Sequence, residues 1–108
     1  MQFSKQLVGT NMAIFKIPLI STNHRINVAL GKTTYTLQFI YRVNKWFVDI
    51  LDLTGEYLIA AIPMVIGDNL LGQHQHIIQG GLYVSNTNED EIHRFDDLGQ
   101  TIQLYWSE

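Results

Sequence analysis

The sequence predicts a small all-β domain, either an antiparallel β-barrel or a two-sheet sandwich of about seven strands, with little helix. Short runs of β-branched and aromatic residues recur along the chain, separated by Gly, Asn and Asp. No window carries apolar residues at helical spacing over three turns. The 108 residues, 46% of them hydrophobic, suffice for one core. We therefore expect a single β domain over residues 12–108, preceded by a polar N-terminal arm over residues 1–11.

Three strands are expected in the first part of the chain, over residues 12–20, 24–30 and 33–42. The dipeptide Gly31-Lys32 is short enough to close a hairpin between the last two. Both strands of this hairpin alternate, so each should direct its apolar side chains to one face. These side chains are Ile26, Val28 and Leu30 in the first strand, and Tyr35, Leu37, Phe39 and Tyr41 in the second.

Two further strands should complete a meander, over residues 46–53 and 57–66. The first is apolar on both faces, which is typical of a central strand, and Thr54-Gly55 supplies the turn that follows it. Pro18 and Pro63 lie in apolar runs where a missing N–H would break a central ladder. Each proline should therefore mark a sheet edge, a bulge or a strand end.

Regular alternation stops after Ile66. Residues 67–72 predict a turn or one helical turn, with Asp68 as its cap. Strands are expected over residues 80–86 and 100–107, joined by a polar loop over residues 87–99.

The charges are distributed unevenly along the chain. Residues 1–48 contain six Lys and Arg and no acid, whereas residues 49–108 contain one Arg and ten acids, so the two parts carry +6 and −9. Such an asymmetry suggests attraction between copies or partners, unless the folded strands mix the charges in space. The chain has no cysteine and no unbroken apolar run of 18 residues. We expect a soluble protein that begins near Met1, is assembled in a reducing cytoplasm and does not bind a membrane.

Two histidines are the best candidates for metal ligands. His74 and His76 would point the same way on a strand, and Asp68 could supply a third ligand, although nothing in the sequence places it there. Paired histidines in a polar stretch between strands are more often solvated or hydrogen-bonded. We therefore assign them to a polar connection and predict no metal ligand and no cofactor.

Two carboxylates invite an acid/base interpretation. Asp49 and Asp52 lie three apart on an expected strand and so face opposite sides, which argues against a catalytic pair. Asp49 is interpreted as a structural hydrogen-bond acceptor or an interface residue. The chain has no nucleophile elbow, phosphate loop or dinucleotide fingerprint. We predict that it is not an enzyme and has no catalytic residue.

Several aromatic residues could in principle stack bases as an oligonucleotide-binding barrel does. They are Tyr35, Phe39, Tyr41, Trp46 and Phe47. Because such platforms are usually surrounded by positive charge and half of this chain is acidic, we expect these aromatics in the core and no specific nucleic-acid binding.

A series of short strings, in order, resembles the baseplate plug family of contractile-tailed phages. The strings are Ile17-Pro18-Leu19, Ile26-x-Val28-x-Leu30, Tyr35-x-Leu37, Trp46-x-x-Asp49-Ile50, Gly55, Ile62-Pro63-Met64-Val65-x-Gly67-x-Asn69-Leu70-Leu71, Gly80-Gly81-Leu82, Asp97-Leu98-Gly99 and Leu104-Tyr105. The turn Arg42-Val43-Asn44-Lys45 and the two histidines depart from the family pattern.

The resemblance implies a non-enzymatic structural component of the virion, synthesised in the host cytoplasm, at the centre of the tail baseplate near the hub and tube end. It also implies that Asp49 and the glycines are structural. Hub and tube proteins are then the expected partners. Open sheet edges and the charge asymmetry further suggest a homo-oligomeric ring. The alternative is a monomeric β-barrel or sandwich module that binds a ligand or peptide.

Overall fold

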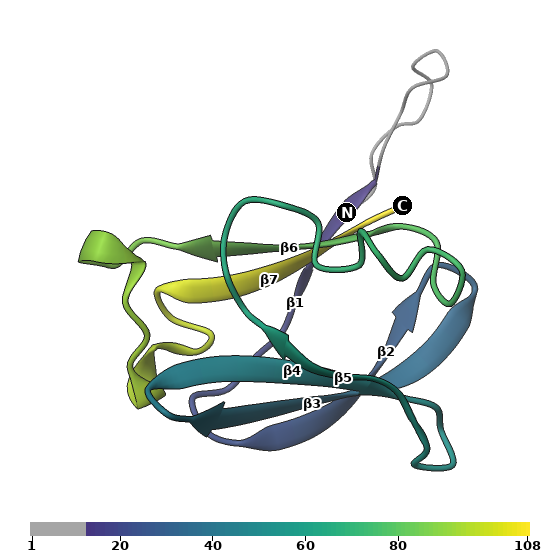
Figure 1. Ribbon diagram of the computed structural model, residues 1–108, viewed down its shortest axis with the longest axis horizontal. Helices are drawn as coiled ribbons and strands as arrows, with labels where there is room; N and C mark the ends of the chain where they lie inside the picture. The colour runs from purple at the N-terminus through teal and green to yellow at the C-terminus, as the bar shows by residue number, and fades with distance from the viewer. Residues whose placement is uncertain (1–12) are drawn as a thin grey trace.

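The computed structural model describes residues 13–108, so the expected arm over residues 1–11 lies outside the described part of the chain. Seven strands and two short 3-10 turns make up the regular structure (Figure 1). Their bounds are β1 Ile14–Ile17, β2 His24–Leu30, β3 Thr33–Arg42, β4 Lys45–Leu51, β5 Tyr57–Pro63, β6 Gly81–Asn86, η1 Glu89–Glu91, η2 Phe95–Asp97 and β7 Ile102–Ser107.

The strands form two antiparallel sheets. One has three strands in the order β1-β7-β6, and the other has four in the order β2-β3-β4-β5. The sheets lie one above the other (Figure 1) and do not close into a barrel. The predicted all-β class is confirmed, and of the two architectures expected, the sandwich is the one found.

Two tight turns set the register of the four-stranded sheet. Gly31, with φ of 74°, and Lys32 connect β2 to β3, and Val43 and Asn44, with φ of 52° and 62°, connect β3 to β4. In the β3–β4 turn the backbone is left-handed at both central residues, which is the geometry of a type I′ hairpin turn, whose twist matches that of the flanking strands. The resulting register pairs Leu37 with Ile50 and Phe39 with Val48 across β3 and β4.

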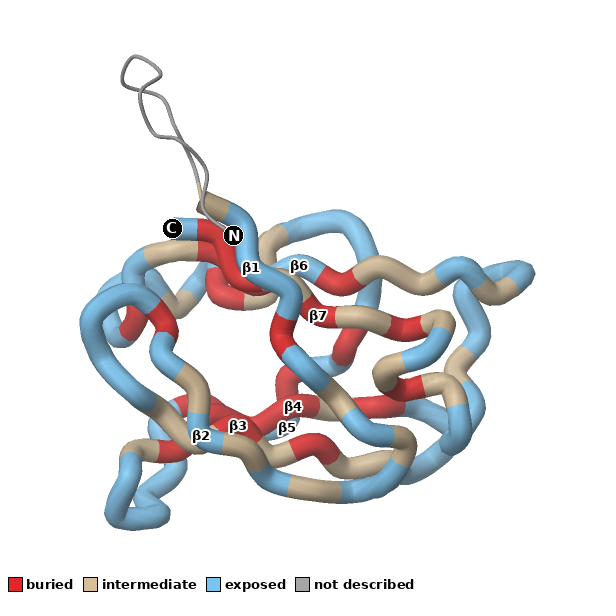
Figure 2. Tube along the Cα trace, turned by 180° about the vertical axis from the view of Figure 1, so that it is seen from behind, coloured by how far each residue is buried: buried red, intermediate tan, exposed pale blue. Residues whose placement is uncertain are grey.

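The core lies between the sheets, as the buried segments in Figure 2 show. Leu37, Phe39, Trp46 and Ile50 are each 0% exposed, which confirms the inward face expected for β3 and β4. The three-stranded sheet contributes inward side chains from every strand: Ile17, Leu82, Val84, Leu104 and Trp106. The core therefore joins segments from both ends of the chain.

Both prolines lie where the sequence predicted. Pro18 directly follows β1, and Pro63 is the last residue of β5, an edge strand of the four-stranded sheet. The strand expected over residues 12–20 is accordingly shorter. The ladder to β4 extends one residue beyond β5, because the Met64 N–H donates to the Trp46 carbonyl at 3.0 Å.

Three sequence expectations need correction. The strand expected to reach residue 66 ends at Pro63, because the Val65 N–H turns back to the Pro63 carbonyl at 3.0 Å. The strand expected to reach residue 53 ends at Leu51, because Asp52 organises the following turn. Of the two alternatives expected for residues 67–72, the structure has the turn, and the correction is that Asp68 caps no helix. No helix among the described residues is long and apolar enough to span a membrane.

Candidate interaction surfaces

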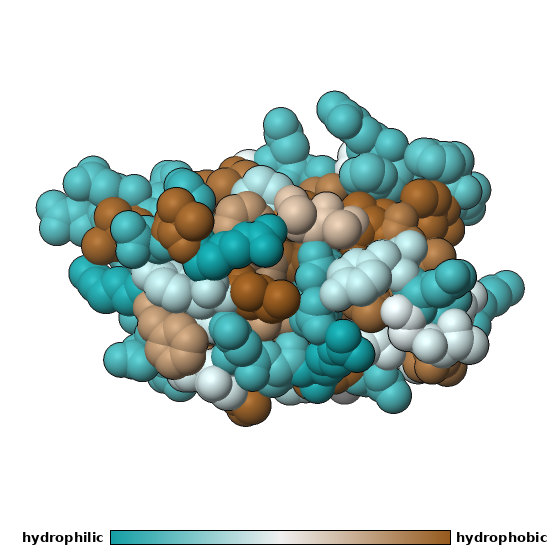
Figure 3. Space-filling view, turned by 60° about the horizontal axis from the view of Figure 1, so that its bottom comes forward, coloured by the Kyte–Doolittle hydropathy of each residue, from teal (hydrophilic) through white to brown (hydrophobic). Residues whose placement is uncertain are grey.

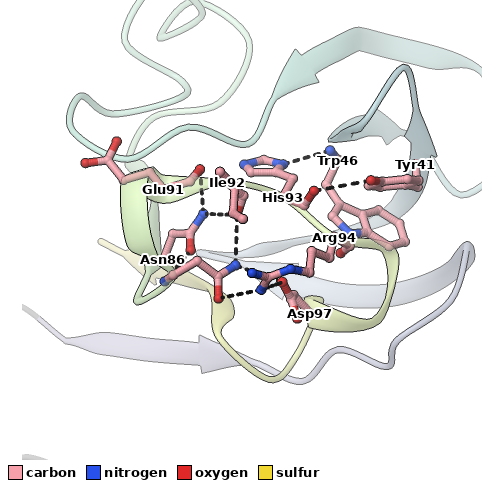
Figure 4. Close-up of polar contacts among 9 residues, drawn as sticks. Tyr41, Trp46, Asn86, Glu91, Ile92, His93, Arg94 and Asp97 are labelled. Carbon is pink, nitrogen blue, oxygen red and sulfur yellow. Dashed lines mark hydrogen bonds and ion pairs between the residues drawn. The ribbon is translucent and has the colours of Figure 1, made fainter.

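The loop over residues 87–99 is attached to the β3–β4 hairpin by three hydrogen bonds (Figure 4). The Trp46 backbone N–H donates to Nδ1 of His93 at 2.9 Å. The Trp46 indole N–H donates to the Arg94 carbonyl at 3.1 Å, and the Tyr41 hydroxyl donates to the His93 carbonyl at 3.2 Å. Phe95 stacks on Trp46 with ring centroids 5.6 Å apart. The loop therefore has one defined position at this end of the sandwich.

The imidazole of His93 is held in its neutral form. Nδ1 can accept the Trp46 N–H only when it carries no proton. Burial lowers the pKa of His93 from its ordinary value, and the nearby Lys45 ammonium lowers it further, while the Met64 carbonyl and Asp97 act in the opposite direction. The loop is thus anchored by a group whose charge state depends on pH.

Hydrogen bonds from asparagine side chains stabilise the rest of the loop (Figure 4). Asn86 donates to the carbonyls of Glu91 and Ile92, and Asn88 donates to the Ile92 carbonyl and to Asp97. Asp97 also accepts from Arg94 at 3.3 Å, the one ion pair within residues 13–108. These bonds compensate a strained backbone, because Asp90 and Glu91 have φ of 57° and 54°.

The charges at this end are partly mixed within one chain. Lys45 lines a hollow of about 190 Å³ together with Asp90, Glu91 and His93. Basic and acidic parts of the sequence therefore already lie side by side here within one chain. This is the mixing of charges by the fold that the sequence left open as the alternative to a contact between chains. The same end also exposes apolar side chains, since Ile92 and Phe95 are 42% and 41% exposed.

The outer face of the four-stranded sheet carries a polar ladder. Arg25 donates to Gln38 at 2.6 Å, Gln38 donates to Asp49 at 2.8 Å, and the Ala61 N–H donates to the other Asp49 oxygen at 2.6 Å. Asp49 is buried, and the three bonds run across all four strands. On this side of the molecule, teal polar groups separate the brown apolar ones (Figure 3). The interpretation of Asp49 as a structural acceptor is confirmed.

Asp52 lies in the turn after β4 and not on the strand where the sequence placed it. Its carboxylate accepts from the Thr54 N–H at 2.9 Å, the Thr54 hydroxyl at 2.6 Å and the Glu56 N–H at 2.9 Å. The Thr54 hydroxyl is the main cause of its lowered pKa, followed by the Glu56 N–H. Asp52 therefore shapes a turn, and it forms no pair with Asp49.

His74 and His76 lie in the turn-rich connection between β5 and β6, so the strand geometry that would align them is absent. His74 lines a groove of about 560 Å³ with Asp68 and with apolar side chains such as Val65 and Ile66, whereas His76 is exposed. Within residues 13–108, no group of three or more His, Cys, Asp or Glu is placed to hold a metal ion.

The aromatic residues do not form one stacking surface. Phe39 and Trp46 are buried, and Tyr35 and Tyr41 pack against the core cluster. Phe47 lies on the other face of β4, under the Arg42 guanidinium, 4.9 Å from the ring centroid. The core role is confirmed for all but Phe47. Sequence reasoning missed the anchoring role of His93, although His-Arg-Phe within a polar loop was a possible signal.

The sheet edges differ in how they are covered. The Leu70 N–H donates to the Leu82 carbonyl at 2.8 Å, and the Leu82 N–H donates to the Asn69 side chain at 2.9 Å, so a loop covers β6. The β5 edge has register shifts and ends in Pro63. Strands β1 and β2 form the remaining edges, and neither contains a proline.

The fold and these surfaces define a class of protein, a small two-sheet β-sandwich with a charged loop hydrogen-bonded to its β3–β4 hairpin. Residues 14–108 match the family model described as cyanophage baseplate Pam3 plug gp18. The chain therefore belongs to this family of phage baseplate plug proteins, as the motif resemblance predicted. It is a structural component of the tail baseplate, which associates with other baseplate or tail proteins in the virion. A comparison with curated proteins finds no match.

Proposed function

We propose that the chain acts at the centre of the baseplate, near the hub and tube end, as a plug subunit that assembles into a homo-oligomeric ring. The observation that supports this most is the family match over residues 14–108 combined with two sheet edges, β1 and β2, that no other described segment covers. Uncovered edges are a liability in a monomer and a means of assembly in a ring. A heterologous contact between different patches of neighbouring copies closes into a ring when the rotation allows it.

Charge would set the register of that contact. Lys16, Arg25 and Lys32 lie on β1, β2 and the β2–β3 turn, whereas the acids of the loop over residues 87–99 lie at the end where β3 meets β4. In the proposed ring, basic residues of one copy face this acidic loop of the next. Exposed pairs contribute only about 0–1 kcal/mol each, so buried apolar area must supply most of the affinity.

We further propose that residues 12–108 form one domain, that the protein is made in the host cytoplasm, and that its role involves no catalysis, cofactor, membrane or specific nucleic-acid contact. Support for the single domain comes from the core cluster, which combines side chains of both sheets. The hub and tube proteins are the proposed neighbours. A monomeric module that binds a ligand or peptide is the second candidate, favoured by the groove beside His74.

Light scattering coupled to size exclusion separates these proposals. The purified chain, alone and mixed with the hub and tube proteins of the same phage, should elute as a closed oligomer or as a complex with the hub. The mass in solution gives the number of copies. A chain that stays monomeric alone and with every tail protein would contradict the ring and favour the binding module.

A further inference from the structure

We infer that β2 is a docking edge for an extended acidic segment of another tail protein, which would add to the four-stranded sheet as a fifth strand. This inference rests on the proposed assembly role and names the edge and the kind of partner. Strand addition supplies affinity through main-chain hydrogen bonds and specificity through alternate side chains.

The hairpin geometry decides which backbone groups of β2 are available. A two-residue turn makes the flanking residues Leu30 and Thr33 a hydrogen-bonded pair, and such pairs alternate along antiparallel strands. Ile26 and Val28 therefore bond to β3. The alternate residues Arg25, Asn27 and Ala29 direct their N–H and C=O groups away from the sheet, and all three are exposed.

The other edges are shorter or covered. The β5 edge is irregular. Ala61 has φ of 57° and donates its N–H to the Asp49 carboxylate, and the strand ends at Pro63. The β6 edge is hydrogen-bonded to the loop over residues 69–71. The β1 strand has four residues, whereas β2 has seven in unbroken register with β3. The long regular edge thus has no proline, no bulge and, among the described residues, no covering segment, and Arg25 is the one Lys or Arg residue in β2.

The side of the sandwich that carries β1 and β2 faces the viewer in Figure 2. It carries both apolar and basic side chains. Phe15 lies opposite the inward-facing Trp106 and is 43% exposed, and Ile26 and Val28 face the core but are only partly buried. Lys16, Arg25 and Lys32 are exposed there, and residues 13–48 contain no acid, while Glu108 lines a hollow together with Lys32. An added strand with alternating apolar side chains and carboxylates fits both properties.

A second copy of β2 fits less well as the occupant. Antiparallel pairing of two such edges would bring together two segments that each carry Arg25 and Lys32 and no carboxylate. Like charges placed across an interface oppose association. The partner is therefore a strand from a different chain.

Peptide titration of the ¹⁵N-labelled protein tests this inference. The probes are the capped octapeptides (Val-Glu)₄ and (Val-Lys)₄. We expect (Val-Glu)₄ to shift the amide signals of Arg25, Asn27 and Ala29 and to slow their hydrogen exchange, and (Val-Lys)₄ to bind at least about tenfold more weakly. Shifts centred on another edge, equal binding of the two peptides, or no shift at millimolar peptide would each overturn the inference.

A matched pair of variants isolates the backbone contribution. Ala29→Pro removes an outward N–H from β2, and Ala60→Pro places a proline on β5, the other edge strand of this sheet, where the residue is also exposed. Only Ala29→Pro should weaken (Val-Glu)₄ binding, by about tenfold. If Ala29→Pro fails to fold, the Lys16→Glu, Lys32→Glu double variant serves instead, and it should reverse the preference between the peptides. An unchanged preference in that folded double variant would contradict the inference.

The peptide titration tests the β2 docking edge, and light scattering tests the ring, so the two proposals can fail independently. A chain that is monomeric by light scattering but binds (Val-Glu)₄ at β2 refutes the ring and supports the edge. A chain that forms a ring without any peptide effect at β2 refutes the edge and leaves the ring intact.

Discussion

At the scale of single residues, one imidazole connects three parts of the chain. His93 accepts the Trp46 N–H, lies near the Met64 carbonyl, and belongs to the loop that carries most of the exposed acids. The neighbouring charges are those of Lys45, Asp97, Asp90 and Glu91. Because burial and Lys45 both disfavour the imidazolium, folding stabilises the neutral form.

The free energy of unfolding should therefore fall as the pH is lowered. The folded pKa of His93 lies below its ordinary value of 6.5, so the contribution is complete above pH 6.5 and is lost as the pH falls through the folded pKa. His93→Gln should be less stable by about 1 kcal/mol at pH 7 and show a flatter dependence between pH 7 and pH 5. Urea unfolding at several pH values measures both.

His76→Gln provides the control, because His76 is an exposed residue in the β5–β6 connection. It should retain the pH dependence of the natural chain. If His93→Gln and the natural chain lose stability equally on acidification, another group is responsible and the role assigned to His93 is wrong.

At the scale of elements, the β3–β4 turn combines favourable geometry with an unfavourable residue. Both central residues are left-handed, which matches the twist of the hairpin, but the first is a valine that is 85% exposed. A β-branched residue at positive φ is strained, and Asn and Gly are the residues that relieve this strain.

Val43→Asn should raise the free energy of unfolding by about 1 kcal/mol, because Asn tolerates left-handed backbone. The midpoint of urea unfolding measures the gain. Val65→Asn serves as control, since Val65 is also exposed but is not left-handed, and it should give no increase. A midpoint for Val43→Asn at or below that of the natural chain would show that the turn stores no strain.

At the scale of the whole molecule, the acidic loop and the basic edge strands lie in different places. The loop over residues 87–99 extends from one end of the long axis, and the β2–β3 turn with Lys32 lies toward the other (Figure 1). Within residues 13–108, the two parts share the hollow at Lys45, but no ion pair joins them. Most of the charge asymmetry therefore remains available for contacts between chains.

Reversing Glu89, Asp90 and Glu91 to lysine should slow or misdirect assembly while the monomer stays folded. The effect should be largest at low salt, because screening weakens exposed pairs. Light scattering over time measures assembly, and circular dichroism checks the fold. The comparison variant Glu56→Lys, Asp68→Lys changes exposed acids outside the loop and should assemble normally. An assembled structure in which the loop acids face solvent or a lumen would contradict this prediction.

The sequence alone determined the strands and the core. Alternation in residues 24–42 is a local property, so it predicts which face of each strand is buried, and Leu37 and Phe39 lie where it predicts. Pro18 and Pro63 limit their strands through their missing N–H groups, which is also a local effect. The order of the short motifs along the chain was likewise sufficient to predict the family, because it can be read from the sequence without a structure.

Only the tertiary structure decided how distant segments meet. Local pattern cannot place His93 against Trp46, Asn69 against the edge of β6, or Ala61 against Asp49, because each contact joins different elements of the fold, and the sequence separations are 47, 13 and 12 residues. The choice between barrel and sandwich is also non-local, because it depends on which strands remain unpaired. The order of strands in the sheets, and hence the open edge at β2, followed from this packing and could not be predicted from residues 24–30 themselves.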